Sequence, residues 1–371
     1  MTALLTATSI LGDDGRPTYE EAMRHSSLSI MRCSAVGSRR SLSLHDGTLA
    51  PSVLRLRHRH HHACLRNQVT GITVSPSGLI AATHSEPHGH AASVTRVWDF
   101  RGKAAKLVSA EIDDCSLVTY SSTGRFNASI ERAAGTKRIK LRDGESKNWK
   151  ASLDGVGKPA AFGAEGRMFA ATDNQGVVVV YGALGGSGNT LPTKKVAAVV
   201  NHGDTTHVQF LPNGRDIVTL SRDGTVRVSE ARTGRTLRRM EVDGMAVAGG
   251  RGACALGVSP DGKVVVSVWS KVVYIWKHEA GRMSTWELNS VRSNEGWPLA
   301  ISPDCRLLAC RTEDGMDVSD VYSGQVLAEV RSAPGIEGMI TAAGFSADGR
   351  MMAVGRYCGV VDIWDTAPYD D

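Results

Sequence analysis

The chain has 371 residues, of which 42% are apolar and 22% are charged, with a formal net charge of +5. This composition is typical of globular proteins and excludes wholesale disorder and fibrous repeats. No apolar run reaches the ~18 residues that cross a bilayer, and the opening segment lacks the basic start of a secretion signal, so we expect no membrane span. The seven cysteines form no Cys-x-x-Cys pair. Their odd number favours a reducing, intracellular environment, cytoplasmic, nuclear or both.

The positive charge is concentrated near the N-terminus. Residues 1–66 hold nine arginines and five acidic residues, whereas the remaining 305 residues carry 34 basic and 33 acidic side chains. We therefore expect any attraction to nucleic acid or acidic partners to lie in this Ser/Arg-rich arm, while the body is neutral overall. The most basic stretch, Ala22–Arg66, holds eight of these arginines and no interleaved aromatic residue for stacking on bases, which counts against nucleic acid as its partner.

A short pattern of an apolar run, a polar turn and a second apolar run recurs along the chain. Its turns end at Gly78, Gly124, Gly166, Gly214, Gly262, Cys305 and Gly349, which are 46, 42, 48, 48, 43 and 44 residues apart. Each turn is followed by two segments rich in Val, Ile and Thr and bounded by Gly, Asp and Ser, which indicates strands. The period predicts seven β-sheet units stacked into a closed ring, because such units cannot bury both faces alone.

The repeated residues resemble those of WD-repeat β-propellers. The resemblance is carried by the turn Ser259-Pro-Asp-Gly262, the dipeptides Trp98-Asp99 and Trp364-Asp365, and the period, and it covers roughly 53–371. The family's Gly-His signature is best matched by Asn201-His202. Thr219, Ser221 and Asp223 match that histidine's partners, whereas Ser229 replaces the family's tryptophan, so the network is incomplete in this unit. The resemblance implies four-stranded antiparallel blades.

The family closes its ring with an N-terminal strand that completes the last blade. Ser52–Arg57, alternating apolar and basic, is the best candidate for that strand, with Leu54 and Leu56 facing inward. We predict two regions, an arm over residues 1–52, flexible or a degenerate repeat, and an all-β, seven-bladed propeller over residues 53–371. Leu28–Gly47 echoes Phe126–Gly144, which leaves an eighth blade as an alternative.

Two histidine-rich segments offer ligands for metal. His58, His60, His61 and His62 are interleaved with arginines that would repel a cation, and the other segment, with His84, Glu86, His88 and His90, lies in a long turn with Pro87 and Gly89. A solvated strand end and a surface loop explain them equally, so we assign no metal or cofactor. His84 and His88 are retained as candidate partner contacts, because long loops on rigid scaffolds often bind.

The strands expected around the central channel lack catalytic side chains. They contain no Asp, Glu, Lys, Arg or Cys and one histidine, His207. No phosphate-binding loop or nucleophile elbow occurs in the chain. This pattern predicts a protein that is not an enzyme, the alternative being loop residues such as His84–His90 that meet over the channel.

Because the sequence does not support catalysis, the surface of the propeller is the remaining candidate for function. In WD-repeat proteins the loops between the second and third strands of each blade line the face that most often binds partners. By position, the candidate contacts are Arg132, Asn174, Arg222, Trp269, Glu313 and Tyr357. Arg, Tyr and Trp are enriched at interface hot spots. We therefore predict a non-enzymatic scaffold or adaptor that binds one or more proteins or peptides, with RNA binding by the basic arm as the second alternative.

Overall fold

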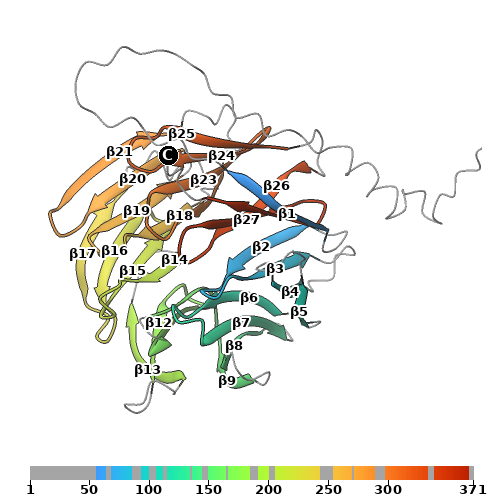
Figure 1. Cartoon of the computed structure of the whole chain (residues 1–371). Helices are drawn as coiled ribbons and strands as arrows, with labels where there is room; N and C mark the ends of the chain where they lie inside the picture. The colour runs from blue at the N-terminus through green and yellow to red at the C-terminus, as the bar shows by residue number, and fades with distance from the viewer. Residues whose placement is uncertain are drawn as a thin grey trace, which may run out of the picture. The chain divides into compact units, whose positions relative to one another are not determined.

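The computed structural model describes residues 56–63, 68–85, 93–99, 106–111, 115–133, 136–143, 149–163, 166–183, 191–199, 205–242, 254–269, 271–288, 297–332 and 338–366. The arm over 1–52 and the echo at Leu28–Gly47 lie outside these residues. In this part of the chain the regular structure is entirely β, and its strands form seven four-stranded antiparallel sheets (Figure 1).

The sheets follow one another in chain order, and we number them as blades 1 to 7. Blade 1 consists of β2 (Val69–Val74), β3 (Leu79–Ser85), β4 (Ser93–Asp99) and β5 (Lys106–Glu111). Blade 2 consists of β6 (Cys115–Tyr120), β7 (Phe126–Ala133), β8 (Thr136–Asp143) and β9 (Trp149–Asp154). Blade 3 consists of β10 (Val156–Phe162), β11 (Met168–Asp173), β12 (Val178–Ala183) and β13 (Pro192–Val199). Blade 4 consists of β14 (Thr205–Phe210), β15 (Asp216–Ser221), β16 (Thr225–Glu230) and β17 (Thr236–Glu241).

The remaining blades repeat this order. Blade 5 consists of β18 (Cys254–Val258), β19 (Val264–Trp269), β20 (Val272–Lys277) and β21 (Arg282–Glu287). Blade 6 consists of β22 (Trp297–Ile301), β23 (Leu307–Thr312), β24 (Gly315–Asp320) and β25 (Val326–Arg331). Blade 7 consists of β26 (Ile340–Phe345), β27 (Met351–Arg356), β28 (Val360–Asp365) and β1 (Arg57–Ala63). The predicted all-β propeller of four-stranded antiparallel blades is confirmed.

The first strands of neighbouring blades pack against one another, and those of the last and first blades do so as well. β26 packs against β2, and Thr341 Oγ1 donates a hydrogen bond to Val69 O at 2.6 Å. In Figure 1, the blue β2 accordingly lies beside the red strands of blade 7. The first strand of each blade is therefore its innermost one, and its last strand lies at the outer edge.

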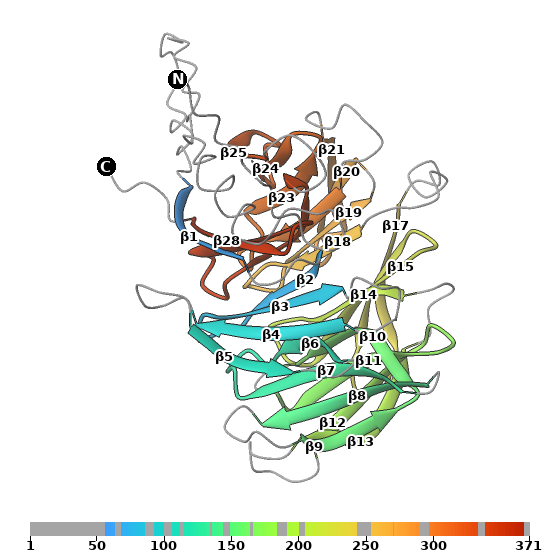
Figure 2. The ribbon, with the colours of Figure 1, turned by 90° about the vertical axis from the view of Figure 1, so that its right-hand side faces the viewer.

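The outer strand of blade 7 differs from the predicted one. The strand that pairs antiparallel with β28 is β1, Arg57–Ala63, rather than Ser52–Arg57 (Figure 2). Leu56 is half-buried against the core of blade 7, as its alternation with arginine suggested, whereas Leu54 lies outside the described residues. An edge strand is held by main-chain hydrogen bonds, so its side chains need not alternate. The apolar alternation in Ser52–Arg57 therefore indicated only the start of β1, at Arg57.

The turn between the first and second strands has the same backbone hydrogen bond in every blade, and in blades 1, 2, 5, 6 and 7 a serine hydroxyl closes it as well. In blade 5, Ser259 Oγ donates to Asp261 Oδ1 at 2.6 Å and accepts from Val264 N at 2.9 Å. Gly262 ends the turn with a φ of +71°, which glycine adopts at little cost. Cys305 occupies the equivalent position in blade 6 with a φ of 57°. The repeated Ser-Pro-Asp-Gly pattern is thus the signature of one turn geometry.

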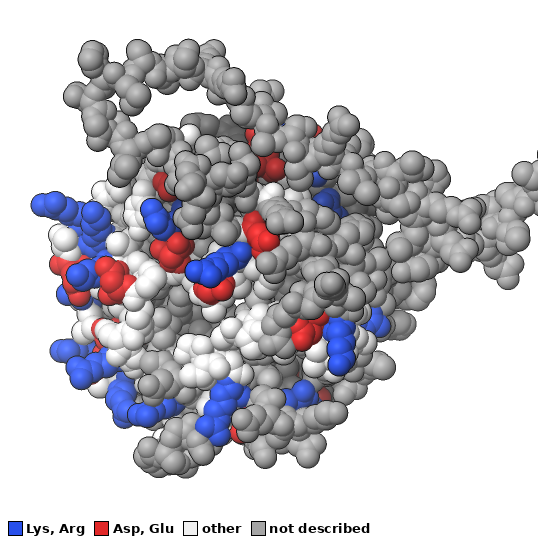
Figure 3. All heavy atoms as spheres, viewed as in Figure 1, with Lys and Arg blue, Asp and Glu red and all other residues white. Residues whose placement is uncertain are grey.

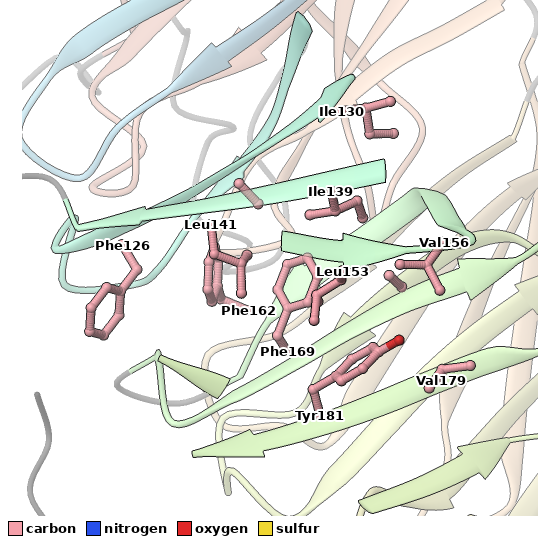
Figure 4. Packing of buried hydrophobic residues seen from close by; sticks show 12 residues of the cluster. Phe126, Ile130, Ile139, Leu141, Leu153, Val156, Phe162, Phe169, Val179 and Tyr181 are labelled. Carbon is pink, nitrogen blue, oxygen red and sulfur yellow. The ribbon is translucent and has the colours of Figure 1, made fainter. Parts of the chain in front are cut away.

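Apolar side chains fill the space between neighbouring blades. Between blades 2 and 3, the ring centroid of Phe162 lies 6.5 Å from that of Phe126 and 4.8 Å from that of Phe169 (Figure 4). Ile139, Leu141 and other side chains from the two sheets complete this cluster. Each blade thus buries its faces against its neighbours, as the repeat pattern predicts.

At the rim, the turn after the third strand packs on the preceding blade. Gly234, in the turn between β16 and β17, has a φ of +74°, and a Cβ there would lie 2.2 Å from the carbonyl oxygen of Ala198 in β13 of blade 3. In blade 6 the equivalent turn accepts a hydrogen bond at Val321 O from Trp286 Nε1 of blade 5, at 2.7 Å. Neighbouring blades are therefore joined at their outer strands as well as at their inner ones.

Replacing Gly234 with alanine is expected to destabilise the fold more than the same change at Gly281. Gly281 lies in the equivalent turn of blade 5 with a φ of +63°, but a Cβ there would meet nothing within 4 Å. Gly281→Ala should cost about 1 kcal/mol from backbone strain, whereas Gly234→Ala adds the clash with blade 3 and should cost about 3 kcal/mol. Urea unfolding of both variants measures the difference, and equal costs would show that this turn does not bear on blade 3.

Candidate functional site

Four of the predicted contacts lie exposed on the turns between the second and third strands. Asn174 and Arg222 lie in these turns of blades 3 and 4, and Glu313 and Tyr357 in those of blades 6 and 7. All blades share one topology and their first strands lie side by side, so these turns emerge at the same end of the sheets. We call the surface formed by these four residues the loop face.

Carboxylates hold the turns of blades 3 and 4 in a fixed conformation. Asp173 Oδ1 accepts hydrogen bonds from Gln175 N at 2.8 Å and Val177 N at 3.0 Å. Asp223 Oδ1 accepts from Thr225 N at 2.9 Å and from Thr225 Oγ1 at 2.7 Å. Burial would raise the pKa of Asp223, but these bonds, a further one with Ser221 and the charge of Arg227 together keep that pKa below its ordinary value. The carboxylate is therefore an ionised cap that fixes its turn.

The segment that leaves blade 6 and the segment that enters blade 7 are each tied to such a turn. Ser332 N donates to Asp314 O at 2.8 Å in blade 6, and Tyr357 N donates to Met339 O at 2.8 Å in blade 7. Between blades, Thr205 Oγ1 of blade 4 donates to Gly176 O of blade 3 at 2.9 Å. The loop face thus presents its exposed side chains from a hydrogen-bonded frame.

Under Tyr357 lies a buried ion pair that sequence reasoning missed. Arg356 Nε donates to Asp362 Oδ2 at 2.6 Å, and these side chains are 13% and 4% exposed. Arg356 Nη1 also donates to Gly338 O at 3.0 Å and to Ser332 Oγ at 3.3 Å. The pair therefore joins β27 and β28 to the segments that enter blade 7. The available signal was Asp362 itself, an acidic residue within the apolar run Val360-Val-Asp-Ile-Trp364.

The other predicted contacts are placed differently. Trp269 is 2% exposed at the end of β19, where it packs in the core between blades 4 and 5, so its assignment to the loop face is wrong. Arg132 lies within β7 with its Cα opposite that of Lys137, and its side chain is outside the described residues. His84 lies within β3 opposite Val94 rather than in the following loop, and its side chain is likewise outside the described set.

Two of the predicted features lie outside the described residues. One is the long loop of blade 1, with His88. The other is Asn201-His202, although Thr219 and Ser221, the predicted partners of that histidine, are described and buried. Ser229, in place of the family's tryptophan, is buried with its Oγ unpaired among the described residues.

Among the described residues no group of three or more His, Cys, Asp or Glu side chains is placed to hold a metal ion. The described chain also has no helix long and apolar enough to cross a membrane.

The single histidine of the innermost strands is held neutral. His207 lies in β14, its Nδ1 is buried, and among the described residues that atom has no hydrogen-bond partner. Burial lowers the pKa of His207 to about 4. The imidazole is therefore uncharged at neutral pH.

Removing Asp362 is expected to destabilise the fold strongly. Asp362→Ala leaves the buried Arg356 guanidinium without its anionic partner, and we expect the free energy of unfolding to fall by about 3–5 kcal/mol. Asp314→Ala is the matched control, because its ion pair with Arg331 is exposed and spans 3.8 Å, so it should cost less than about 1 kcal/mol. Urea unfolding measures both, and similar losses would contradict the importance of the buried pair.

His207 makes folding stability depend on pH. Its folded pKa, about 4, lies below the ordinary 6.5, so the unfolded chain binds the proton more readily. Stability should therefore rise with pH between about 4 and 6.5, by up to about 3 kcal/mol, and be lost again as the pH falls. His207→Gln should flatten the wild-type curve over that range in unfolding measured at several pH values. An unchanged curve would mean that His207 is not buried as a neutral group.

A family model described as WD domain, G-beta repeat, matches residues 193–228. Comparison with curated proteins gave no match. The matched segment runs from β13 through most of β16, which is the outer strand of one blade and then the next blade's first three strands. The same unit recurs around the fold, each time with the same turn geometry. The chain is a WD-repeat β-propeller.

Proposed function

We propose that the chain is a non-enzymatic scaffold that binds one or more partner proteins or peptides on its loop face. The observation that carries this proposal is that Arg222, Glu313 and Tyr357 are exposed on turns fixed by hydrogen bonds. A rigid surface loses little conformational entropy when a partner binds. Tyr and Arg are also the residue types that most often anchor interfaces.

The ring supports this function as a platform. We propose that the seven blades act as one closed body in which β1, the N-terminal strand, completes blade 7. In such a body the turns of distant blades keep fixed separations, so one partner can engage several of them. The propeller fold itself is compatible with many activities, and the proposal therefore depends on the exposed residues rather than on the fold.

We further propose that this scaffold works inside the cell, in the cytoplasm, the nucleus or both. Cys305, Cys310 and Cys358 are free thiols, which suits a reducing compartment. Burial raises the pKa of Cys305 and of Cys310 to about 12, so these thiols stay protonated and unreactive.

Substituting the loop face is expected to remove bound partners without unfolding the protein. The variant carries Arg222→Glu and Tyr357→Ala, and the matched control carries Arg350→Glu and Tyr322→Ala, exposed residues in turns at the opposite end of the sheets. Affinity purification from the native cells with quantitative identification of co-purifying proteins compares both with the unchanged chain. Partners should fall at least about tenfold in the first variant and persist in the control.

The same experiment can contradict the proposal. An unchanged set of partners in the loop-face variant, with equal melting temperatures for all three proteins, would move the binding surface away from these turns. Equal losses in both variants would show that net charge, rather than the loop face, holds the partners.

A further inference from the structure

The outer strands of blades 3 and 4 carry an excess of positive charge that those of blades 1, 2, 5 and 6 do not. In the remaining complete blades each outer strand has one basic and one acidic residue: Lys106 and Glu111, Lys150 and Asp154, Arg282 and Glu287, and Arg331 and Glu329. By contrast, β13 has two lysines and no acidic residue, and β17 has two arginines and one glutamate. β1 also has two arginines without an acid, but its side chains lie outside the described residues.

Six exposed cations form this surface, which we call the basic edge: Lys194 and Lys195 in β13, Arg232 and Arg235 in the following blade's turn, and Arg238 and Arg239 in β17. Arg239 forms an ion pair with Glu241. The other five form no ion pair with any residue that the structure describes. Their charge is therefore available to a partner.

The turn of blade 4 makes the basic edge continuous across two blades. Gly234, between Arg232 and Arg235, abuts Ala198 in β13, as described above. Lys195 lies three residues before Ala198 on that strand, or roughly 10 Å away at the rise of a β-strand. In Figure 3, Lys and Arg atoms predominate along the lower-left rim, where Figure 1 places the turn ends of β15, β16 and β17.

The acidic residues nearby are already engaged. Glu230 Oε2 accepts a hydrogen bond from Thr233 Oγ1 at 2.6 Å. Asp216 Oδ2 accepts one from Asn213 Nδ2 at 2.8 Å. Both carboxylates are half-buried, whereas the six cations are exposed. The surface that solvent meets is thus strongly positive.

We propose that the basic edge binds an acidic, extended segment of a partner protein, at a surface separate from the loop face. Charge complementarity selects acidic residues and accelerates the encounter. The exposed apolar side chains among the cations are the aliphatic Val196 and Leu237, each 37% exposed. These suit the aliphatic side chains of a peptide, whereas single-stranded nucleic acid is held by stacking on aromatic rings. A protein segment is therefore the occupant that this chemistry fits.

Protection of a sheet edge against aggregation does not explain the excess. Charged side chains on outer strands discourage pairing with other chains. The balanced pairs on β5, β9, β21 and β25 already supply charge at those edges without a net sign. The net positive charge of β13 and β17 exceeds that need and points to an anionic partner.

The test uses the full chain and a short fluorescent peptide of glutamates with two valines, in fluorescence anisotropy at low and high salt. The edge variant carries Arg235→Glu and Arg238→Glu, and the control carries Arg306→Glu and Arg350→Glu, which change net charge equally on blades 6 and 7. We expect the edge variant to bind at least about tenfold more weakly, the control to bind like the unchanged chain, and salt to weaken binding. Should the edge variant lose its circular dichroism signal, Arg235→Gln with Arg238→Gln replaces it.

Three results would overturn the proposal. The first is an equal loss of peptide affinity in the edge variant and the control. The second is the absence of saturable peptide binding by the unchanged chain at low salt. The third is tighter binding of a single-stranded RNA of matched charge than of the peptide. The peptide assay does not involve the loop face, so its outcome is independent of the partner experiment above.

Discussion

Apolar contact between neighbouring blades is the constraint on which the rest of the structure depends. A four-stranded sheet cannot cover both of its faces, so Phe126 of blade 2 packs with Phe162 and Phe169 of blade 3, and Trp269 of blade 5 packs among residues of blade 4. The inner strands must then lie side by side, and Lys158 of β10 is the one charged residue that they carry. Both proposed binding surfaces lie on turns and outer strands, where charged side chains are exposed, whereas Arg356 and Asp362 are paired inside blade 7.

The repeat pattern predicted most of the fold because one turn geometry recurs in every blade. The dipeptides Trp98-Asp99 and Trp364-Asp365, which carried the resemblance, lie at the ends of β4 and β28. Trp269 was misplaced because it is the last residue of β19, equivalent to Thr312 in blade 6, so the turn of blade 5 begins one residue later and Trp269 stays in the core. The closing strand was misplaced because main-chain pairing, unlike burial, leaves no apolar alternation to read.

The two candidate surfaces differ in how far sequence could indicate them. Arg222 and Tyr357 were found because their position in a repeat is fixed, but the buried pair of Arg356 and Asp362 beneath Tyr357 needed side-chain geometry. The basic edge escaped notice because charge averaged over the whole body is close to zero. Only once each strand is assigned to the inside or the rim does the local excess on β13 and β17 become visible.

The pairing of β1 with β28 has a consequence for how the chain folds during synthesis. Arg57 opposes Asp365, so β1 leaves the ribosome long before its partner β28 has been made. Blades 1 to 6 each consist of contiguous strands and can form as they emerge. The sheet of blade 7, which includes β1, is complete only after β28 has been made. The segment Arg57–Ala63 contains two arginines and four histidines, and such polar side chains on an unpaired strand disfavour its aggregation during that interval.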